Sequence, residues 1–149
     1  MTQASKDAQA ASRRTDMPIS NGSPDRSSTR LAHEIGDLII DKKGEDLVVI
    51  DVERVTSLAD LIVIATGRSK RQVLAMAEEI HFFAKRSGIT VVSEEGREQG
   101  WWVLVDFGDV VVHIMQDEAR AYYDLERLWG DGEVVRRVSG DGEGLTTGD

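Results

Sequence analysis

The stretch that decides the fold is WWVLVDFGDVVVHIM, residues 101–115 of a 149-residue chain. Two apolar segments, 101–106 and 110–115, flank the short loop Phe107-Gly108-Asp109. Segments rich in β-branched and aromatic residues favour strands, and a short loop with a glycine available for positive φ favours a tight turn. These residues therefore predict a β-hairpin.

A helix is expected well before the hairpin. Its apolar residues recur three and four positions apart, which places them in one stripe along a helix. These residues are Leu31, Ile35, Leu38 and Ile39. Ser28 or Thr29 can cap the start of this helix, and Gly44 can supply the positive φ that ends it.

Two strands and a second helix are expected between this helix and the hairpin. Segments 47–52 and 61–66 are rich in Val and Ile with little polar alternation, which is typical of strands covered on both faces. The second helix opens where Ser69 and Gln72 have the spacing of a capping box, and Gly88 ends it.

Two further elements complete the expected order. Val91 and Val92 predict a short strand before the hairpin. After the hairpin, Asp117 can cap a last helix. The inner face of that helix is expected to consist of Tyr122, Leu125 and Leu128 or Trp129. Together, these helices and strands predict an α/β domain with a mixed sheet flanked by helices.

The two ends of the chain differ in composition from its middle. Residues 1–30 include both prolines and no aromatic side chain, and residues 130–149 are rich in glycine. Such segments bury too little apolar surface to offset the entropy lost on ordering. We therefore expect a single domain with disordered tails: an N-terminal tail over 1–30, the folded domain over 31–129 and a flexible C-terminal tail over 130–149.

The chain is acidic, with 27 Asp and Glu against 18 Lys and Arg and a formal charge of −9. Most of this excess lies within 31–129. Nucleic-acid binding draws much of its affinity from Lys and Arg that neutralise phosphates. The composition therefore disfavours direct nucleic-acid binding and favours a basic protein as partner.

Several classes of site and of location are excluded by what the sequence lacks. It has no cysteine, so disulfides, thiolate zinc sites and cysteine nucleophiles are excluded. No apolar run approaches the roughly 18 residues of a membrane-spanning helix. The first residues lack the apolar core of a secretory signal. We expect a cytoplasmic protein that does not bind membranes.

The most chemical local feature is Gly67-x-Ser69, between an expected strand and an expected helix. A metal-dependent nucleotidyltransferase uses such a turn to hold a triphosphate and needs two carboxylates, one residue apart on a neighbouring strand, for its metal ions. The next acids, Glu78 and Glu79, are adjacent and point about 100° apart on a helix. Ser69 is therefore interpreted as a helix cap, and a nucleotidyltransferase is the alternative function.

The histidines and tryptophans are the other candidates for function. His33, His81 and His113 lack the spacing of a metal site, so no metal or cofactor is expected. His113 interrupts an apolar strand, so either it has a hydrogen-bond partner in the core or its face meets a partner protein. Trp101 and Trp102 point to opposite faces of their strand. One can belong to the core, and the other lies under a helix or on an exposed, interface-forming face.

Several of these segments occur together in one known family. Residues 59–73 read A-D-L-I-V-I-A-T-G-x-S-x-R-Q-V, and Glu95-Gly96 follows. After them come W-V-L-V-D-F-G-D-V-V-V-H-I-M at 102–115 and R-x-x-Y-x-L-E-x-L-W at 120–129. In this order and spacing they resemble the ribosomal silencing factor, or Iojap-like, family over residues 31–129. The family tryptophan corresponds to Trp102, which leaves Trp101 without an expected role.

The resemblance implies a nucleotidyltransferase-like α/β fold that has lost catalysis. It also implies binding to the large ribosomal subunit through its fourteenth protein, uL14, which blocks docking of the small subunit and represses translation. A steric block needs no active site, so the protein is not expected to be an enzyme. A homodimer of the free protein is left open, and a generic dimerising α/β adaptor is the weaker alternative.

The partner-binding residues are expected in the hairpin and the last helix. The expected contact patch consists of Trp102, Asp106, Phe107, Asp109 and Met115. His113, Arg120 and Tyr123 are expected to support or extend it.

Overall fold

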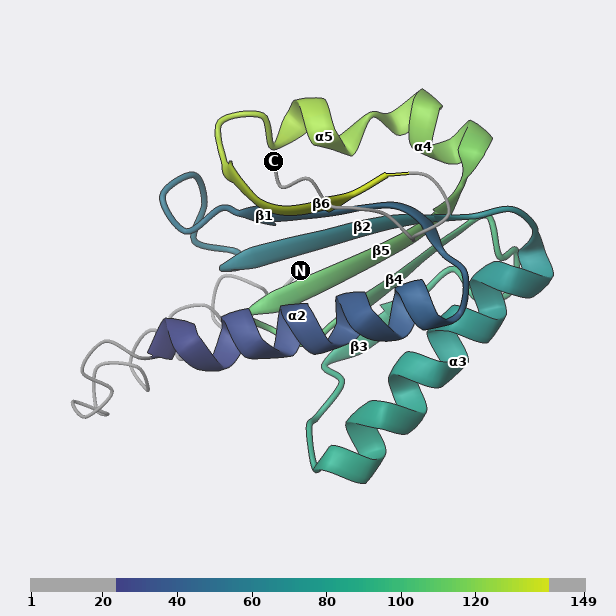
Figure 1. The fold of residues 1–149 in the computed structure, drawn as a ribbon, viewed down its shortest axis with the longest axis horizontal. Coiled ribbons are helices and arrows are strands. Elements are labelled where there is room, and N and C mark those ends of the chain that lie inside the picture. Colours follow the sequence, from purple (N-terminus) through teal and green to yellow (C-terminus); the bar gives the residue numbers. More distant parts are fainter. Residues whose placement is uncertain (1–23, 140–149) are drawn as a thin grey trace.

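A six-stranded sheet forms the centre of the protein (Figure 1). The structure is a computed structural model that describes residues 24–139, except for the side chains of 24–26. The strands are β1 (Glu45–Asp51), β2 (Leu61–Gly67), β3 (Ser93–Glu95), β4 (Trp102–Asp106), β5 (Val110–Gln116) and β6 (Glu133–Val138). Their order across the sheet is β3-β4-β5-β2-β1-β6. Neighbours β2 and β5 are parallel and the other four pairs are antiparallel, so the expected mixed sheet is confirmed.

Four helices flank the sheet within residues 24–139. They are α2 (Pro24–Asp41), α3 (Lys70–Ser87), α4 (Asp117–Tyr123) and α5 (Leu125–Leu128). The first two lie across one face of the sheet (Figure 1), and α4 and α5 pack against the other. In the described part of the chain, no helix combines the length and apolar character that crossing a membrane requires.

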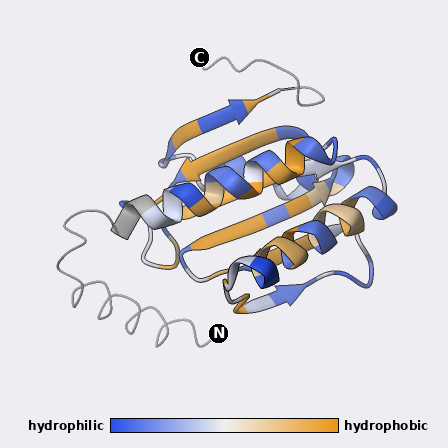
Figure 2. Ribbon diagram, turned by 60° about the horizontal axis from the view of Figure 1, so that its bottom comes forward, coloured by the Kyte–Doolittle hydropathy of each residue, from blue (hydrophilic) through white to orange (hydrophobic). Residues whose placement is uncertain are grey.

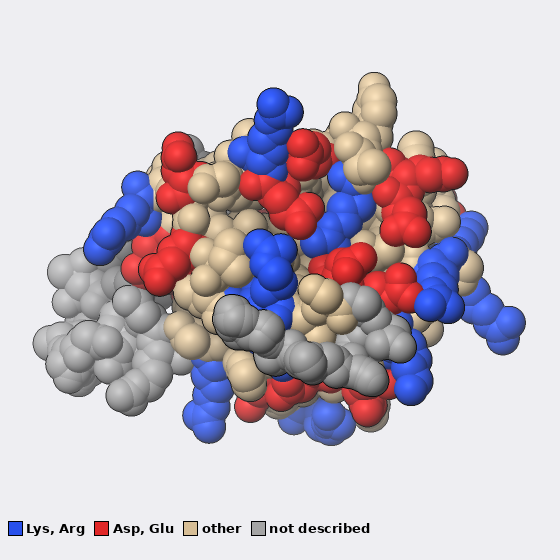
Figure 3. Space-filling view, turned by 45° about the horizontal axis from the view of Figure 1, so that its top comes forward, with Lys and Arg blue, Asp and Glu red and all other residues tan. Residues whose placement is uncertain are grey.

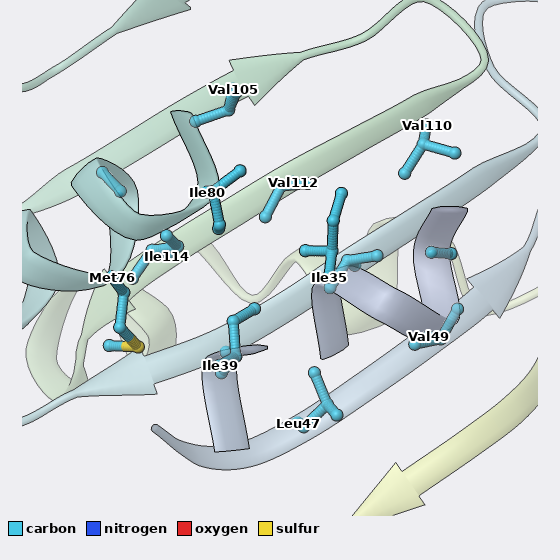
Figure 4. Close-up of a cluster of buried hydrophobic side chains, with 14 of the residues drawn as sticks. Ile35, Ile39, Leu47, Val49, Met76, Ile80, Val105, Val110, Val112 and Ile114 are labelled. Carbon is cyan, nitrogen blue, oxygen red and sulfur yellow. The ribbon is translucent and has the colours of Figure 1, made fainter. Parts of the chain in front are cut away.

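The larger hydrophobic core lies between the sheet and the pair α2 and α3 (Figure 4). Ile35 and Ile39 of α2 and Met76 and Ile80 of α3 are fully buried there. Figure 2 shows α2 and α3 as amphipathic, with apolar and polar stretches along each helix. Burying one such side chain contributes about 1.5–3 kcal/mol, so this core holds the sheet rigidly from one side.

The opposite face of the sheet is covered over only part of its width. Ala119 of α4 and Leu125 of α5 join a second core that includes Ile64 of β2 and Met115 of β5. On β4, by contrast, alternate residues are only partly buried. The helices therefore leave an open sheet face at β4.

Helix α3 begins and ends as predicted from the sequence. The Ser69 hydroxyl accepts a hydrogen bond from the Gln72 backbone N–H at 3.1 Å, and Gly88 ends the helix with a φ of 72°. The Gln72 side chain also donates to the carbonyls of residues 42 and 43. This cap therefore ties the start of α3 to the end of α2. The β4–β5 hairpin is also confirmed, with Gly108 at a φ of 97°.

The predicted start of the first helix is wrong. Helix α2 already begins at Pro24, so Ser28 and Thr29 lie inside it and do not cap it. Ser28 is buried, and its hydroxyl donates to a carboxylate oxygen of Asp60 at 3.4 Å. The hydrogen bond to Asp60 explains why the polar Ser28, which the sequence pattern placed at the helix start, is buried.

The end of α2 also differs from its prediction. Lys43, and not Gly44, has the positive φ, at 67°. Gly44 is required for packing instead, because a Cβ there would collide with the Ile39 side chain and lie 2.9 Å from the sulfur of Met76.

The short strand and the last helix are shifted from their predicted places. Strand β3 starts at Ser93, after Val91 and Val92, and Val91 packs against the larger core. The last helix is broken in two by Asp124, which has a φ of 47°. Gln116 precedes α4 without a side-chain cap, so Asp117 is the first helical residue and not the cap.

The break changes the inner face of the last helix. Leu125 is buried as expected, together with Ala119, and Trp129 packs partly against the same core. Tyr122 is exposed, which corrects its predicted inward orientation; of the two alternatives Leu128 and Trp129, Leu128 is exposed and Trp129 lies on the inner face.

The C-terminal tail expected over 130–149 contains a strand. Residues 133–138 form β6, which pairs with β1, and Val138 is buried. The charged residues of β6 break the apolar pattern that would have marked a strand. The expectations for 1–23 and 140–149 fall outside the described residues.

Candidate protein-binding surface

The open sheet face is formed by alternate residues of the hairpin and by α4. Trp102, Leu104 and Asp106 of β4 lie opposite Met115, His113 and Val111 of β5, respectively. Because side chains alternate along a strand, these residues share the face turned away from α2 and α3. We call Trp102, Leu104, Asp106, Val111 and Tyr123 the β4–β5 surface; all five are at least partly accessible.

Trp102 is held between a histidine and a tyrosine. Its indole N–H donates to Nδ1 of His113 at 3.0 Å. The indole ring also contacts the Tyr123 ring. The two ring centroids lie 4.5 Å apart, and the ring planes are inclined by 44°. Tyr122 then meets Tyr123 edge-on at 4.9 Å. The result is a connected row of rings that runs from buried His113 to Tyr122, which is 77% exposed.

His113 is a neutral buried base. Burial lowers its pKa from 6.5 to about 4. Since the indole can only donate, Nδ1 of His113 is the acceptor and the neutral ring carries its proton on Nε2. Of the two interpretations left open by the sequence, the internal hydrogen-bond partner is thus found, and the same bond fixes a residue of the surface.

Arg120 is turned inward and not toward a partner. It forms a two-point ion pair with Glu126, at 3.2 and 2.9 Å. A third nitrogen donates to the Asp46 carbonyl at 2.6 Å and to the Thr66 hydroxyl at 2.9 Å. The hydrogen bond from Arg120 holds the pKa of Glu126 below its usual range, against the opposing effect of burial. The Arg120 side chain is only 12% exposed. Its contacts join α4, near Tyr123, to α5 and to strands β1 and β2.

The structure does not bring the turn residues together with Trp102. The turn lies at the far end of β4, where Asp106 accepts a hydrogen bond from the Gly108 N–H at 2.7 Å. Phe107 packs against the core on the α2 and α3 side, and the Asp109 carbonyl accepts from the backbone of 60 and 61. The expected patch therefore divides, and Phe107 belongs to the opposite side of the sheet.

Met115 also differs from its expected place. It is fully buried beneath α4 and α5, although it lies directly opposite Trp102. Leu104 and Val111 were missed from the sequence and connect Trp102 to Asp106 across the surface. The two-residue alternation of β4 and β5 was the available signal for both.

The Gly67-x-Ser69 turn serves as the helix cap that was predicted. Ser69 accepts the capping bond from Gln72, and residues 24–139 hold no group of three or more His, Cys, Asp or Glu side chains placed to bind a metal ion. The fold and the β4–β5 surface define an α/β domain that presents a partly open sheet face with aromatic side chains.

Comparison with known proteins assigns the family. The sequence profile described as "Ribosomal silencing factor during starvation" matches residues 25–146. The chain is 49% identical over 90 residues to the ribosomal silencing factor of Chromobacterium violaceum, covering 60% of this chain and 74% of that protein. It is 47% identical over 95 residues to that of Bacillus subtilis, covering 64% and 80%.

Solved structures agree with the sequence relatives. A crystal structure of a Chromobacterium violaceum protein superposes with a TM-score of 0.64 and 42% identity, covering 79% of this chain and 95% of that one. The chain belongs to the ribosomal silencing factor family. The profile extends past β6, in agreement with a domain that does not end at residue 129.

Proposed function

We propose that this protein represses translation by binding the large ribosomal subunit through its fourteenth protein, uL14. A bound domain would occupy the face on which the small subunit docks, and this steric block needs no catalysis. Family membership supports the ribosomal role. The observation that carries the choice of surface is the Trp102–Tyr123 pair on an open sheet face, whose ring centroids lie 4.5 Å apart with the ring planes tilted by 44°. A cytoplasmic location follows from the same proposal.

The β4–β5 surface has the composition of an interface centre. Aromatic side chains in well-packed surroundings contribute most of the binding energy at protein interfaces. Because His113 and Tyr123 already hold Trp102, little side-chain freedom is lost on binding. An interface of roughly 800 Å² on each partner would extend from this pair to Leu104 and Val111.

The charge of the domain suits a basic partner. Residues 24–139 contain 22 acidic and 15 basic side chains, a net charge of −7. Figure 3 shows acidic groups interspersed with basic ones around uncharged side chains on one face of the molecule. Complementary charge mainly accelerates encounter and selects the partner.

Two neighbouring tryptophans provide a matched test. Trp102→Glu places a charge in the β4–β5 surface, and Trp101→Glu places the same charge one residue before β4, at a residue that is 42% exposed. We expect Trp102→Glu to reduce co-sedimentation with large subunits at least about tenfold and to restore subunit joining. Trp101→Glu should behave as the unmodified chain does.

The folded state of each variant is checked by far-UV circular dichroism. If Trp102→Glu does not fold, Leu104→Arg replaces it, because Leu104 lies on the same surface and is only partly buried. Undiminished binding by a folded variant of this surface would contradict the proposal. A homodimer of the free protein that uses this surface would be disrupted by the same substitutions, which analytical ultracentrifugation measures.

A further inference from the structure

We propose that Arg120 is a positioning residue, which fixes the break between α4 and α5 and thereby holds Tyr123 against Trp102 in its binding geometry. This inference rests on the function proposed above. It replaces the expectation that Arg120 contacts the partner directly.

Arg120 connects four parts of the chain at one point. Its own helix is α4, and its ion-pair partner Glu126 lies in α5. The remaining bonds reach the carbonyl of Asp46 in β1 and the hydroxyl of Thr66 in β2. One planar guanidinium therefore sets the position of both short helices relative to the sheet.

Tyr123 lies inside the segment that this guanidinium spans. It is the last residue of α4, and Asp124 follows with a φ of 47° before α5 starts at the buried Leu125. A non-glycine residue in the left-handed region is held there by its surroundings. With Arg120 before the break and Glu126 after it, the ion pair determines where the chain turns and hence where the Tyr123 ring lies.

The position of Tyr123 matters because its ring both packs against the domain and remains accessible to a partner. It contacts the Trp102 ring with a centroid separation of 4.5 Å and remains 44% exposed. A ring that is already fixed binds without a further loss of conformational freedom. If the break were free to move, Tyr123 would leave Trp102, and the surface would have to be ordered again on binding.

Lysine cannot take over this role. A lysine ammonium is a single point charge, whereas the arginine guanidinium presents five donors in a fixed planar arrangement. Arg120→Lys can keep a charge near Glu126 but cannot pair with Glu126 at two points and also reach Asp46 and Thr66. The substitution therefore removes the combined contacts of Arg120 with Glu126, Asp46 and Thr66 while keeping the charge of the protein.

The test uses the full-length chain labelled with ¹⁵N. Three indole N–H signals are expected, and Trp102→Phe assigns that of Trp102, which reports both the bond to His113 and the nearby Tyr123 ring. We expect Arg120→Lys to shift the Trp102 signal, to leave that of Trp101 in place and to weaken binding to isolated large subunits about tenfold. The matched control is Arg127→Lys, because it makes the same substitution at an arginine of α5 that is 80% exposed.

Each outcome bears on the proposal. An unchanged Trp102 signal, or unchanged affinity despite a shifted signal, would overturn it. Loss of affinity in Arg127→Lys to the same extent would also overturn it, because the loss would then not depend on the contacts of Arg120. If Arg120→Lys does not fold, Glu126→Gln tests the same ion pair. If the unmodified chain does not bind large subunits, the proposed function fails, while the indole signals still test the positioning role.

Discussion

His113 shows how one buried residue can support a surface that it does not itself form. It is 7% exposed, yet its Nδ1 accepts the only hydrogen bond that the Trp102 indole can donate. A phenylalanine at 113 would fill a similar space but would leave the indole N–H without this acceptor. The polar interruption of strand β5 is therefore explained by its hydrogen bond to Trp102 on the neighbouring strand.

The pKa of His113 makes stability depend on pH. Because burial lowers this pKa to about 4 in the folded state, the unfolded chain binds a proton more readily between about pH 6.5 and pH 4. The stability associated with neutral His113 is present above pH 6.5 and is lost as pH falls through this window. Between pH 7 and pH 5 we expect about 2 kcal/mol to be lost through this group.

Urea unfolding at the two pH values measures this loss, with His113→Gln as the comparison. The glutamine does not titrate, so its stability should fall less between pH 7 and pH 5 than that of the unmodified chain. An equal fall in both proteins would be inconsistent with His113 as the source.

At this scale, the sequence predicted the candidate site in part. Trp102 and Tyr123 were identified and lie in contact. Phe107 was misplaced because a turn interrupts the alternation that assigns strand residues to faces. The burial of Met115 and the inward direction of Arg120 depend on α4 and α5 crossing the sheet, which no local pattern reports.

Among the elements, β6 completes the side of the sheet formed by β1. It pairs with β1 along its length, and Val138 is buried opposite Leu47. Arg136 of β6 also donates to Asp37 of α2 at 2.8 Å and to the carbonyl of His33 at 3.1 Å. Strand β6 therefore joins the sheet edge to the first helix.

Truncation tests the contribution of β6. A chain ending at residue 129 should unfold at a clearly lower temperature than the full chain, because it exposes the edge of β1 and loses the Arg136 contacts. A chain ending at residue 139 is the control and should retain the unfolding temperature of the full chain. Thermal unfolding followed by circular dichroism compares them; equal midpoints for all three would show that β6 adds no stability.

At the level of elements, prediction from sequence succeeded where local signals agree. The hairpin and α3 combine apolar pattern, cap and turn residues, and both were confirmed. The break at Asp124 was missed because an apolar stripe continues through it, and the bonds that hold it come from distant strands. Strand β6 was missed because its two arginines break the apolar pattern of a strand. Arg136 contacts α2, and Arg137 is exposed to solvent.

For the whole molecule, we expect the acidic excess to act on encounter with the proposed basic partner more than on the bound state. Seven excess negative charges on residues 24–139 attract a basic partner over distances that salt shortens to about 8 Å at physiological ionic strength. Trp102, Leu104 and Val111 of the β4–β5 surface carry no charge, so the contacts that we propose for them should be far less sensitive to salt.

Binding kinetics at different salt concentrations separate these contributions. We expect the association rate constant for large subunits to fall as salt rises from about 50 to about 300 mM, with little change in the dissociation rate constant. Surface plasmon resonance with captured subunits provides both constants. A salt effect confined to dissociation would mean that charged pairs, and not the aromatic pair, hold the complex together.

The parallel pairing of β2 with β5 has a consequence for when the protein becomes active during its synthesis. Parallel neighbours need a long crossover, and here residues 68–109 lie between the two strands. Trp102 and Tyr123 meet only after this crossover has closed and the chain has continued through α4. A nascent chain therefore has no completed β4–β5 surface until Tyr123 has been translated and has packed against Trp102, so the elements from α2 to α4 must all be made before the proposed binding surface exists.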